Sequence, residues 1–190
     1  LLVLAAKDGG RYAVPALAIF AASMILLYGA STTYHTFNIS EKVNKVLRKI
    51  DHMMIFILIA GSYTPICVIP LRDTVGIPLL ILVWAVAIAG MLIKAFWITC
   101  PKWFSSTIYI AMGWLCVLAM VPLVQTLPTA AFIWLVAGGV IYTIGGVIYA
   151  LKLPLFNAKH RYFGSHEIFH VFVMAGSLCH YVTMFYIAKM

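Results

Sequence analysis

Two histidines that lie four residues apart, His166 and His170, open the last long apolar stretch of the chain. Residues at this spacing share one face of a helix, so that both imidazoles can bind the same metal ion. With Glu167 between them they read H-E-x-x-H, the zinc-protease signature in which the glutamate is the general base. The alternative interpretation is a pair of polar residues at a membrane boundary. For the pair alone, the second interpretation is favoured.

The elements that must position these side chains are predicted from composition. Of 190 residues, 64% are hydrophobic and only 9% are charged, whereas an ordinary soluble domain has about 25% charged residues. Apolar runs of about 18 residues or more recur, each long enough to cross the ~30 Å hydrocarbon core as a helix. Barrel-type alternation is absent, and backbone groups in lipid must be satisfied internally. We therefore expect an all-α, polytopic membrane protein with a single transmembrane domain over residues 1–190.

The expected spans give the architecture of that domain. Residues 1–6 are too short to cross a membrane and resemble the last turns of a helix, so we expect a seven-transmembrane helix bundle whose first helix is largely missing from this chain. A basic segment over residues 38–49 is predicted to form a short amphipathic helix on the membrane surface. The complete spans are expected over residues 12–34, 53–69, 76–97, 105–124, 130–151 and 166–187.

The basic residues predict the orientation of the bundle. The net charge is +8, but the basic residues lie in short clusters between apolar runs, which is typical of membrane loops and not of a nucleic-acid-binding stripe. Nine of them fall on one side and four on the other, so the side with nine should be cytoplasmic. The N-terminus would then be cytoplasmic and the C-terminus extracytoplasmic. The nine are Lys42, Lys45, Arg48, Lys49, Lys94, Lys102, Lys152, Lys159 and Arg161; the four are Lys7, Arg11, Arg72 and Lys189.

With the spans in place, further ionisable residues converge on the two histidines. His35 ends the span 12–34, and Asp51 precedes the span 53–69 on the same side of the membrane. Ionisable groups at membrane depth are costly and usually face the bundle interior, paired with a partner. Three imidazoles with one open position have the composition of a catalytic zinc site. The convergence favours a metal site over two unrelated polar residues.

These residues also resemble a known family. Ser31-x-x-x-His35, Asp51 and His166-x-x-x-His170, together with Gly-Ser-Tyr-Thr-Pro at 61–65 and Met-Gly-Trp at 112–114, resemble the progestin and adipoQ receptor (PAQR) family, in its bacterial hemolysin III branch. The resemblance implies a seven-helix bundle in the bacterial cell membrane with zinc held by His35, His166 and His170. It also implies that Asp51 contacts the zinc-bound water. Ser31 is implied to lie behind the ligands or beside the substrate.

The expected function follows from this site. Zinc would activate water and polarise a lipid amide or ester carbonyl, with Asp51 moving the proton. This describes a ceramidase-like hydrolase, or a protein of membrane lipid homeostasis, with membrane lipids as substrate or ligand. The alternatives are a non-enzymatic sensor or receptor-like protein with structural zinc, a pore-forming haemolysin, and a membrane protease of the H-E-x-x-H type. The substrate and the oligomeric state stay open.

Other polar residues are expected to have structural roles. Glu167 projects about 100° away from His166 on the helix and is interpreted as a helix N-terminal charge. His52 is expected at the membrane interface, and Lys94 is expected to extend its ammonium group towards water. His180 is interpreted as a buried, hydrogen-bonded histidine, with lining of an internal cavity as the alternative. A repeated GGVIY, at 138–142 and 145–149, predicts a smooth stripe for helix packing formed by Gly138, Gly139, Gly145 and Gly146.

Overall fold

The computed structural model describes residues 1–151 and 164–190, and in these ranges the chain is helical apart from short connections. The expectations about Lys152, Lys159 and Arg161 therefore concern residues outside the described ranges. Two elements are not α-helices: the π-helical turn η1 and the 3₁₀ segment η2. The elements are α1 (Leu2–Asp8), α2 (Ala13–Thr36), α3 (Glu41–Val68), η1 (Arg72–Gly76), α4 (Ile77–Phe96), α5 (Lys102–Gly113), η2 (Trp114–Ala119), α6 (Met120–Thr126), α7 (Thr129–Leu151) and α9 (Ser165–Ile187).

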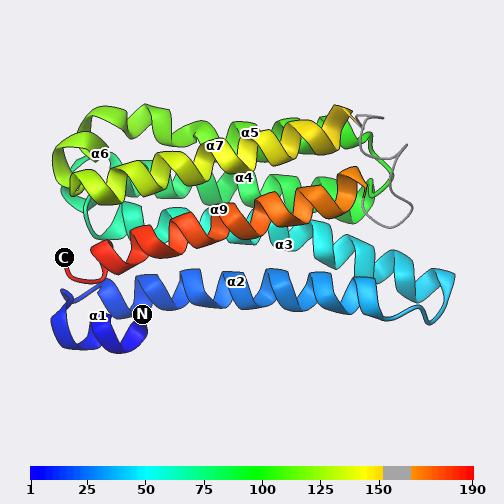
Figure 1. Cartoon of the computed structure of the whole chain (residues 1–190), viewed down its shortest axis with the longest axis horizontal. Coiled ribbons are helices and arrows are strands. Elements are labelled where there is room, and N and C mark those ends of the chain that lie inside the picture. Colours follow the sequence, from blue (N-terminus) through cyan, green and yellow to red (C-terminus); the bar gives the residue numbers. More distant parts are fainter. Residues whose placement is uncertain (152–163) are drawn as a thin grey trace.

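The long helices run roughly side by side as an elongated bundle (Figure 1). The most extensive packing joins α7 to α9, α2 to α3 and α3 to α4. Both ends of the chain lie at one end of the bundle, and the end of α2 and the start of α9 lie at the other (Figure 1). Six helical segments in the described residues are long and apolar enough to cross a membrane. An all-α membrane protein is thereby confirmed, and the seventh span stays a prediction.

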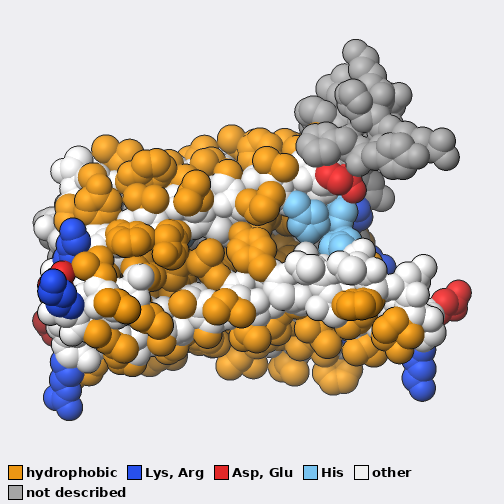
Figure 2. All heavy atoms as spheres, turned by 60° about the horizontal axis from the view of Figure 1, so that its bottom comes forward, with side chains coloured by type: hydrophobic (Ala, Val, Ile, Leu, Met, Phe, Trp, Pro, Cys, Tyr) orange, Lys and Arg blue, Asp and Glu red, His pale blue; other side chains and the backbone are white. Residues whose placement is uncertain are grey.

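The outer surface of the bundle is as apolar as its interior. Phe20 and Phe56 are almost completely buried between the helices, whereas Ile25 is 73% exposed. Hydrophobic side chains cover most of the face shown in Figure 2. Helices that are hydrophobic all round belong in the core of a large protein or in a membrane. In a bundle of this size, the exposed apolar belt is the surface that meets lipid.

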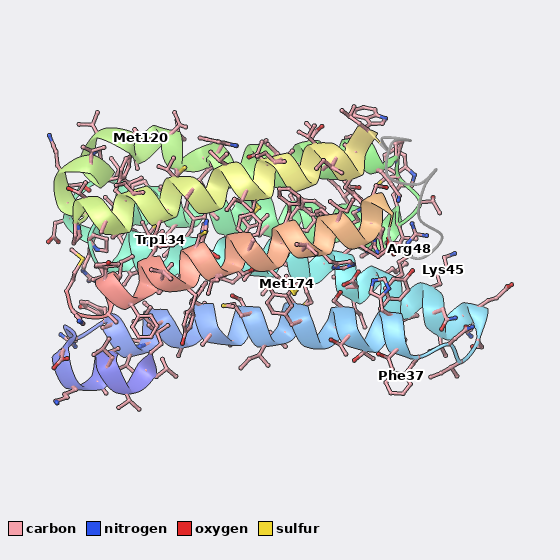
Figure 3. All side chains as sticks on the ribbon, in the orientation of Figure 1. Phe37, Lys45, Arg48, Met120, Trp134 and Met174 are labelled. Atoms are coloured by element: carbon pink, nitrogen blue, oxygen red, sulfur yellow. The ribbon has the colours of Figure 1, made fainter. Side chains whose placement is uncertain are left out.

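Helix α3 differs from the prediction of a separate amphipathic helix over residues 38–49. The structure has one continuous helix, Glu41–Val68, that includes both this segment and the expected span. Ser40 caps it, because the side-chain oxygen accepts a hydrogen bond from the Val43 backbone N–H at 3.3 Å. No proline or glycine separates the basic turns from the apolar ones. Lys45 and Arg48 therefore lie on the first turns of the membrane-crossing helix (Figure 3).

The expected span 105–124 also differs, because it is broken in the middle. It consists of α5, the 3₁₀ segment η2 and α6, and 3₁₀ geometry leaves backbone groups less well paired. Tyr63 on α3 compensates for this. Its hydroxyl lies 2.6 Å from the Gly113 carbonyl oxygen and accepts a hydrogen bond of 2.8 Å from the Cys116 backbone N–H. The two short motifs at 61–65 and 112–114 are thus in direct contact.

Candidate metal centre

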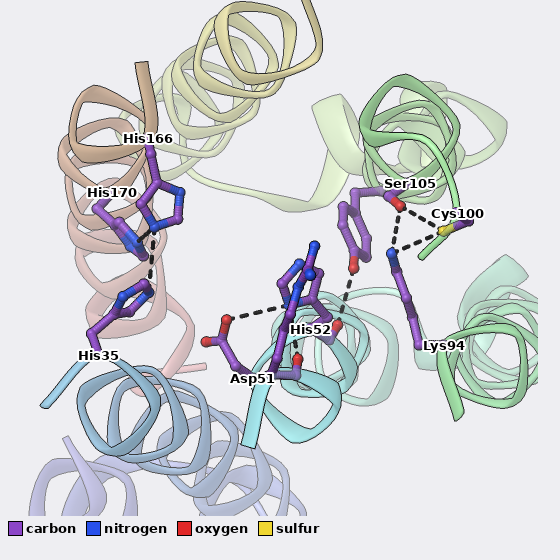
Figure 4. Close-up of polar contacts among 10 residues, drawn as sticks. His35, Asp51, His52, Lys94, Cys100, Ser105, His166 and His170 are labelled. Carbon is purple, nitrogen blue, oxygen red and sulfur yellow. Dashed lines mark hydrogen bonds and ion pairs between the residues drawn. The ribbon is translucent and has the colours of Figure 1, made fainter. Parts of the chain in front are cut away.

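Three histidines meet at the end of the bundle where α2 ends and α9 begins, which we call the histidine end. His35 lies in the last turn of α2, and His166 and His170 lie in the first two turns of α9. The Nε2 atom of His166 is 3.4 Å from Nε2 of His35 and 3.2 Å from Nε2 of His170 (Figure 4). Figure 2 shows histidine side chains reaching the surface at this end of the molecule. One nitrogen from each ring lies within 4.8 Å of the others.

The two distances from His166 Nε2 fit a tetrahedral metal site. Two ligand nitrogens at the usual Zn–N bond length of 2.0–2.1 Å are about 3.3 Å apart in tetrahedral geometry. Hydrogen bonding between the rings explains the contacts less well. A neutral imidazole nitrogen carries either one hydrogen or one lone pair, so His166 Nε2 could serve both neighbours only by sharing one hydrogen or one lone pair between them. A metal ion at the centre satisfies all three nitrogens at once.

Asp51 faces the histidines from α3 but is not a fourth member of the group. Its side chain is buried, and Oδ2 lies 3.4 Å from Nδ1 of His52 (Figure 4). That nitrogen is also 2.9 Å from the Arg48 carbonyl oxygen, which can only accept, so Nδ1 of His52 carries the hydrogen. Ser31, one turn before His35, contacts the Asp51 carboxylate from α2. His52, expected only at the interface, thus helps to hold this carboxylate.

Glu167 does not point towards the three imidazoles. It is exposed, and its Oε2 accepts a hydrogen bond of 2.8 Å from the backbone N–H of Gly164 just before α9. A carboxylate in this position satisfies an otherwise unpaired N–H and interacts favourably with the helix dipole. The glutamate of the apparent H-E-x-x-H motif therefore stabilises the start of the helix, as the sequence predicts.

Aromatic rings lie around the histidines: Tyr34 is a residue whose hydroxyl the sequence offers as an oxyanion donor, whereas Tyr149 has no role predicted from the sequence. The Tyr149 ring centroid lies 5.9 Å from that of His166, and the Tyr34 ring lies 4.7 Å from that of His35. Lys102 places its Nζ 4.3 Å from the centre of the Tyr149 ring, a cation–π contact. Tyr149 ends the second GGVIY repeat. The repeat is therefore a sequence signal for a residue next to the histidines, in addition to helix packing.

Lys94 does not extend towards water as expected. It is 3% exposed, and its Nζ lies 2.5 Å from the hydroxyl of Ser105 and 3.2 Å from the sulfur of Cys100 (Figure 4). The reason is that α5 begins beside the end of α4 and supplies the hydroxyl within the bundle. Lys94 therefore adds a buried positive charge to the histidine end. Cys100 is part of this polar cluster, because its sulfur also lies 3.2 Å from the Ser105 hydroxyl.

An internal cavity connects the histidine end with the middle and far end of the bundle. Its volume is about 190 Å³, counted as the space in which the centre of a water molecule can lie. It is lined at the histidine end by Asp51 and His166, further along α9 by His180, and also by Leu71 and Leu123, which lie beyond the end of α3 and on α6. Most of the other lining side chains are apolar. The cavity is thus mostly apolar, with ionisable side chains at the histidine end.

Comparison with known proteins identifies the family of this chain. The model of the family described as "Haemolysin-III related" matches residues 1–181, a range that includes all three histidines and Asp51. The chain belongs to the haemolysin III family. The "Hemolysin-3 homolog" of Bacillus subtilis (strain 168) is 36% identical over 190 residues, covering 100% of this chain and 85% of that protein. The "Hemolysin-3" of Bacillus cereus is 37% identical over 188 residues, covering 98% and 82%.

The similarity of this haemolysin III protein extends to eukaryotic receptors. The "Adiponectin receptor protein" of Drosophila melanogaster is 27% identical over 176 residues, which cover 83% of this chain and 39% of that protein. The resemblance to the progestin and adipoQ receptor family, inferred from the spaced Ser, Asp and His residues, is thereby confirmed.

Proposed function

We propose that this haemolysin III protein is a zinc-dependent hydrolase of lipid amide or ester bonds in the bacterial cytoplasmic membrane. The observation that carries the proposal is the position of the histidine cluster. Three imidazole nitrogens lie within 4.8 Å of one another, and two of these histidines, His166 and His170, line an apolar cavity. A soft-to-borderline metal such as zinc is the usual partner of three imidazoles. A site with three protein ligands leaves one position open, as catalytic zinc sites do.

The side chains around the cluster have distinct roles in this proposal. Bound zinc would supply Lewis acidity, polarising a carbonyl and increasing the acidity of a nearby water molecule. Asp51, held by His52 and Ser31, accepts the proton of the attacking water and passes it to the departing amine or alcohol. Tyr34, beside His35, provides a hydroxyl that can donate to the developing oxyanion. His35, His166 and His170 hold the ion.

The cavity determines which substrates are accepted. Its apolar lining favours an acyl chain, and its polar residues gather at the histidine end. Arg48, Lys94 and Lys102 line the cavity there, so this end is positively charged and suits a carbonyl that becomes negatively charged in the transition state. A lipid would place its scissile bond at the histidines and its acyl chain towards the middle of the membrane.

The proposed orientation places the histidine end in the cytoplasm. Lys42, Lys45 and Lys49 lie on the first turns of α3 at this end, and the positive-inside rule assigns such clusters to the cytoplasmic side. Gly9 and Ala188 lie in contact at the opposite end, close to the two chain termini. The C-terminus would then be extracytoplasmic.

A structural role for zinc in a non-enzymatic sensor is the second candidate. It is favoured by the origin of the ligands, because a metal ion would connect the end of α2 to the start of α9. Both roles need the metal, but only hydrolysis needs Asp51. The two functions therefore predict different effects of the same substitution.

The decisive experiment compares Asp51→Asn with Glu167→Gln in purified protein. Turnover of ceramides, N-acyl amides and acylglycerol esters is measured by mass spectrometry, together with the zinc content of each variant. We expect Asp51→Asn to keep its zinc and to lose about 10²–10⁴-fold in rate, while Glu167→Gln keeps its activity. Zinc-loaded wild-type protein without turnover on the whole panel would favour the sensor. Loss of activity in Glu167→Gln alone would assign the base to Glu167.

A further inference from the structure

His180 is a polar side chain in the middle of the membrane whose partners are missing from the described residues. Both ring nitrogens are buried, and neither has a hydrogen-bond partner there. The ring also lines the cavity. The interpretation of His180 as a buried, hydrogen-bonded histidine is therefore wrong for this part of the chain, and the alternative, lining of a cavity, holds. Burying a polar group without a partner costs free energy, so an apolar residue would be the cheaper choice.

Hydroxyl groups of neighbouring residues lie near the His180 ring. The Tyr28 hydroxyl donates to Ser177 Oγ at 2.7 Å, and the Tyr142 hydroxyl lies 2.8 Å from the same oxygen. The Tyr142 and His180 ring centroids are 5.3 Å apart, and both side chains, with Tyr28, line the cavity. We call His180, Tyr142, Ser177 and Tyr28 the mid-cavity cluster. It is a second polar region in an otherwise apolar part of the cavity.

The two copies of the GGVIY repeat each contribute a tyrosine to one of the two polar regions of the cavity. Tyr142 ends the first copy and packs against His180, and Tyr149 ends the second copy and packs near His166. The two tyrosines are seven residues apart, or about 10 Å along the helix. Gly138, the first residue of the first copy, makes room for the His180 ring, because a Cβ atom there would collide with it. Each copy thus places one tyrosine next to one histidine.

We propose that the mid-cavity cluster binds a hydroxyl group carried in the middle of an acyl chain. A hydroxyl both donates and accepts a hydrogen bond, so it can pair with either tautomer of the His180 ring. His180 is ten residues after His170, which is about 15 Å along the helix. An extended chain advances about 1.2 Å per bond, as the extended polypeptide backbone does. The matching hydroxyl is therefore near the twelfth carbon. This inference rests on the proposed function, which places the polar head at the histidine end.

The test measures equilibrium binding of three fatty acids to the purified full chain in lipid nanodiscs. The ligands are 12-hydroxyoctadecanoic, 2-hydroxyoctadecanoic and octadecanoic acid, each competing with a fluorescent fatty acid. We expect the 12-hydroxy acid to bind about fivefold more tightly than either of the others, the gain of about one net hydrogen bond. His180→Phe should remove this preference. Leu178→Ala, at a 61% exposed position on the same helix, should keep it.

Tyr142→Phe keeps the ring that packs on His180 and removes only the hydroxyl, so it tests the cluster even where His180→Phe fails to fold. We expect it to reduce the preference to about twofold or less, since only one partner group is changed. Equal affinities for the two hydroxy acids in wild-type protein would mean that His180 is paired by water only, and the proposal would be overturned. A preference that persists in folded His180→Phe would overturn it as well. Fatty acids contain no bond to hydrolyse, so failure of turnover leaves this test unaffected.

Discussion

At the scale of single residues, different side chains at the histidine end would bind the metal and move the proton. The three imidazole rings converge on one point, whereas Asp51 lies outside that group and is held by His52. Asp51 therefore remains free to exchange protons, which a ligand bound to the metal could not do as readily. Glu167 is adjacent to a ligand in sequence, but its carboxylate accepts a hydrogen bond from the Gly164 backbone N–H and stabilises the start of α9.

Removal of one imidazole should release the metal. We expect His166→Ala to lower the zinc content from about one ion per chain to near zero, because two remaining imidazoles do not complete a stable zinc site. Mass spectrometric metal analysis of the purified protein measures this directly. His180→Phe is the matched control, because it removes a histidine of the same helix that lies far from His35, His166 and His170. A zinc content of about one ion per chain in both variants would show that the metal is bound elsewhere.

The buried Lys94 leads to a prediction about stability. Its ammonium group is held by Ser105 and Cys100. Ser105→Ala leaves a buried charge with one partner fewer, and we expect a loss of about 1–3 kcal/mol in the free energy of unfolding. Lys94→Met removes the charge but keeps the shape, and it should be neutral or stabilising. Chemical unfolding in detergent micelles compares the two variants. The reverse order of stability would contradict the described contacts.

Residue type and spacing predict the histidine cluster, but they do not predict the contacts made by the residues around it. His166 and His170 are identifiable because a helix brings residues four apart to one face, and His35 because it ends a span on the same side. Lys94, Cys100 and Ser105 have no such signal. Their contacts depend on how the end of α4 meets the start of α5, which is a tertiary arrangement. Local sequence patterns carry no information about that arrangement.

At the scale of helices, the spans are predictable because apolar length alone identifies them. The interruptions of these spans are not predictable in this way. The basic segment over residues 38–49 has the amphipathic pattern of a surface helix, yet it continues into α3 because nothing breaks it. The 3₁₀ segment over Trp114–Ala119 has no breaker in its sequence either. It depends on hydrogen bonds from Tyr63 of a neighbouring helix.

The contact between α7 and α9 can be tested at two adjacent glycines. A Cβ atom at Gly138 would collide with the His180 ring, whereas a Cβ atom at Gly139 meets nothing within 4 Å. We expect Gly138→Ala to lower the free energy of unfolding by about 1–3 kcal/mol, as overpacking does. Gly139→Ala should be neutral or slightly stabilising. Thermal unfolding of both variants, followed by circular dichroism, measures the difference. Equal effects would mean that the helices can separate at no cost.

At the scale of the whole molecule, the bundle has two chemically different ends. The histidine end carries the candidate metal centre and the basic turns of α3. The opposite end carries Lys7, Arg11, Arg72 and Lys189, near the chain termini.

This polarity predicts opposite accessibilities for two engineered cysteines. Lys189→Cys should react with a membrane-impermeant maleimide in intact cells. Lys42→Cys should react only after the cells are permeabilised. The unsubstituted chain, whose four cysteines are buried or half-buried, is the background control. Labelling of Lys42→Cys in intact cells would reverse the proposed orientation.

Metal removal should affect stability as well as activity. A ligand that binds only the folded state stabilises it by about 2.7 kcal/mol at a concentration 100 times its dissociation constant. We therefore expect zinc to raise the unfolding temperature of wild-type protein, and a chelator to lower it. His166→Ala should respond to neither. A chelator effect of equal size in His166→Ala would indicate an action unrelated to the histidine cluster.

The distance in sequence between the ligands has a consequence for biosynthesis. His35 and His166 are separated by 131 positions, and α9 is the last helix in the described residues. Because a chain emerges from the ribosome N-terminus first, His35 is in the membrane long before its two partners are made. The cluster can close only after α9 has been inserted. Acquisition of the metal would therefore mark a chain in which α9 has been inserted, and nascent chains that stop before α9 would be unable to acquire it.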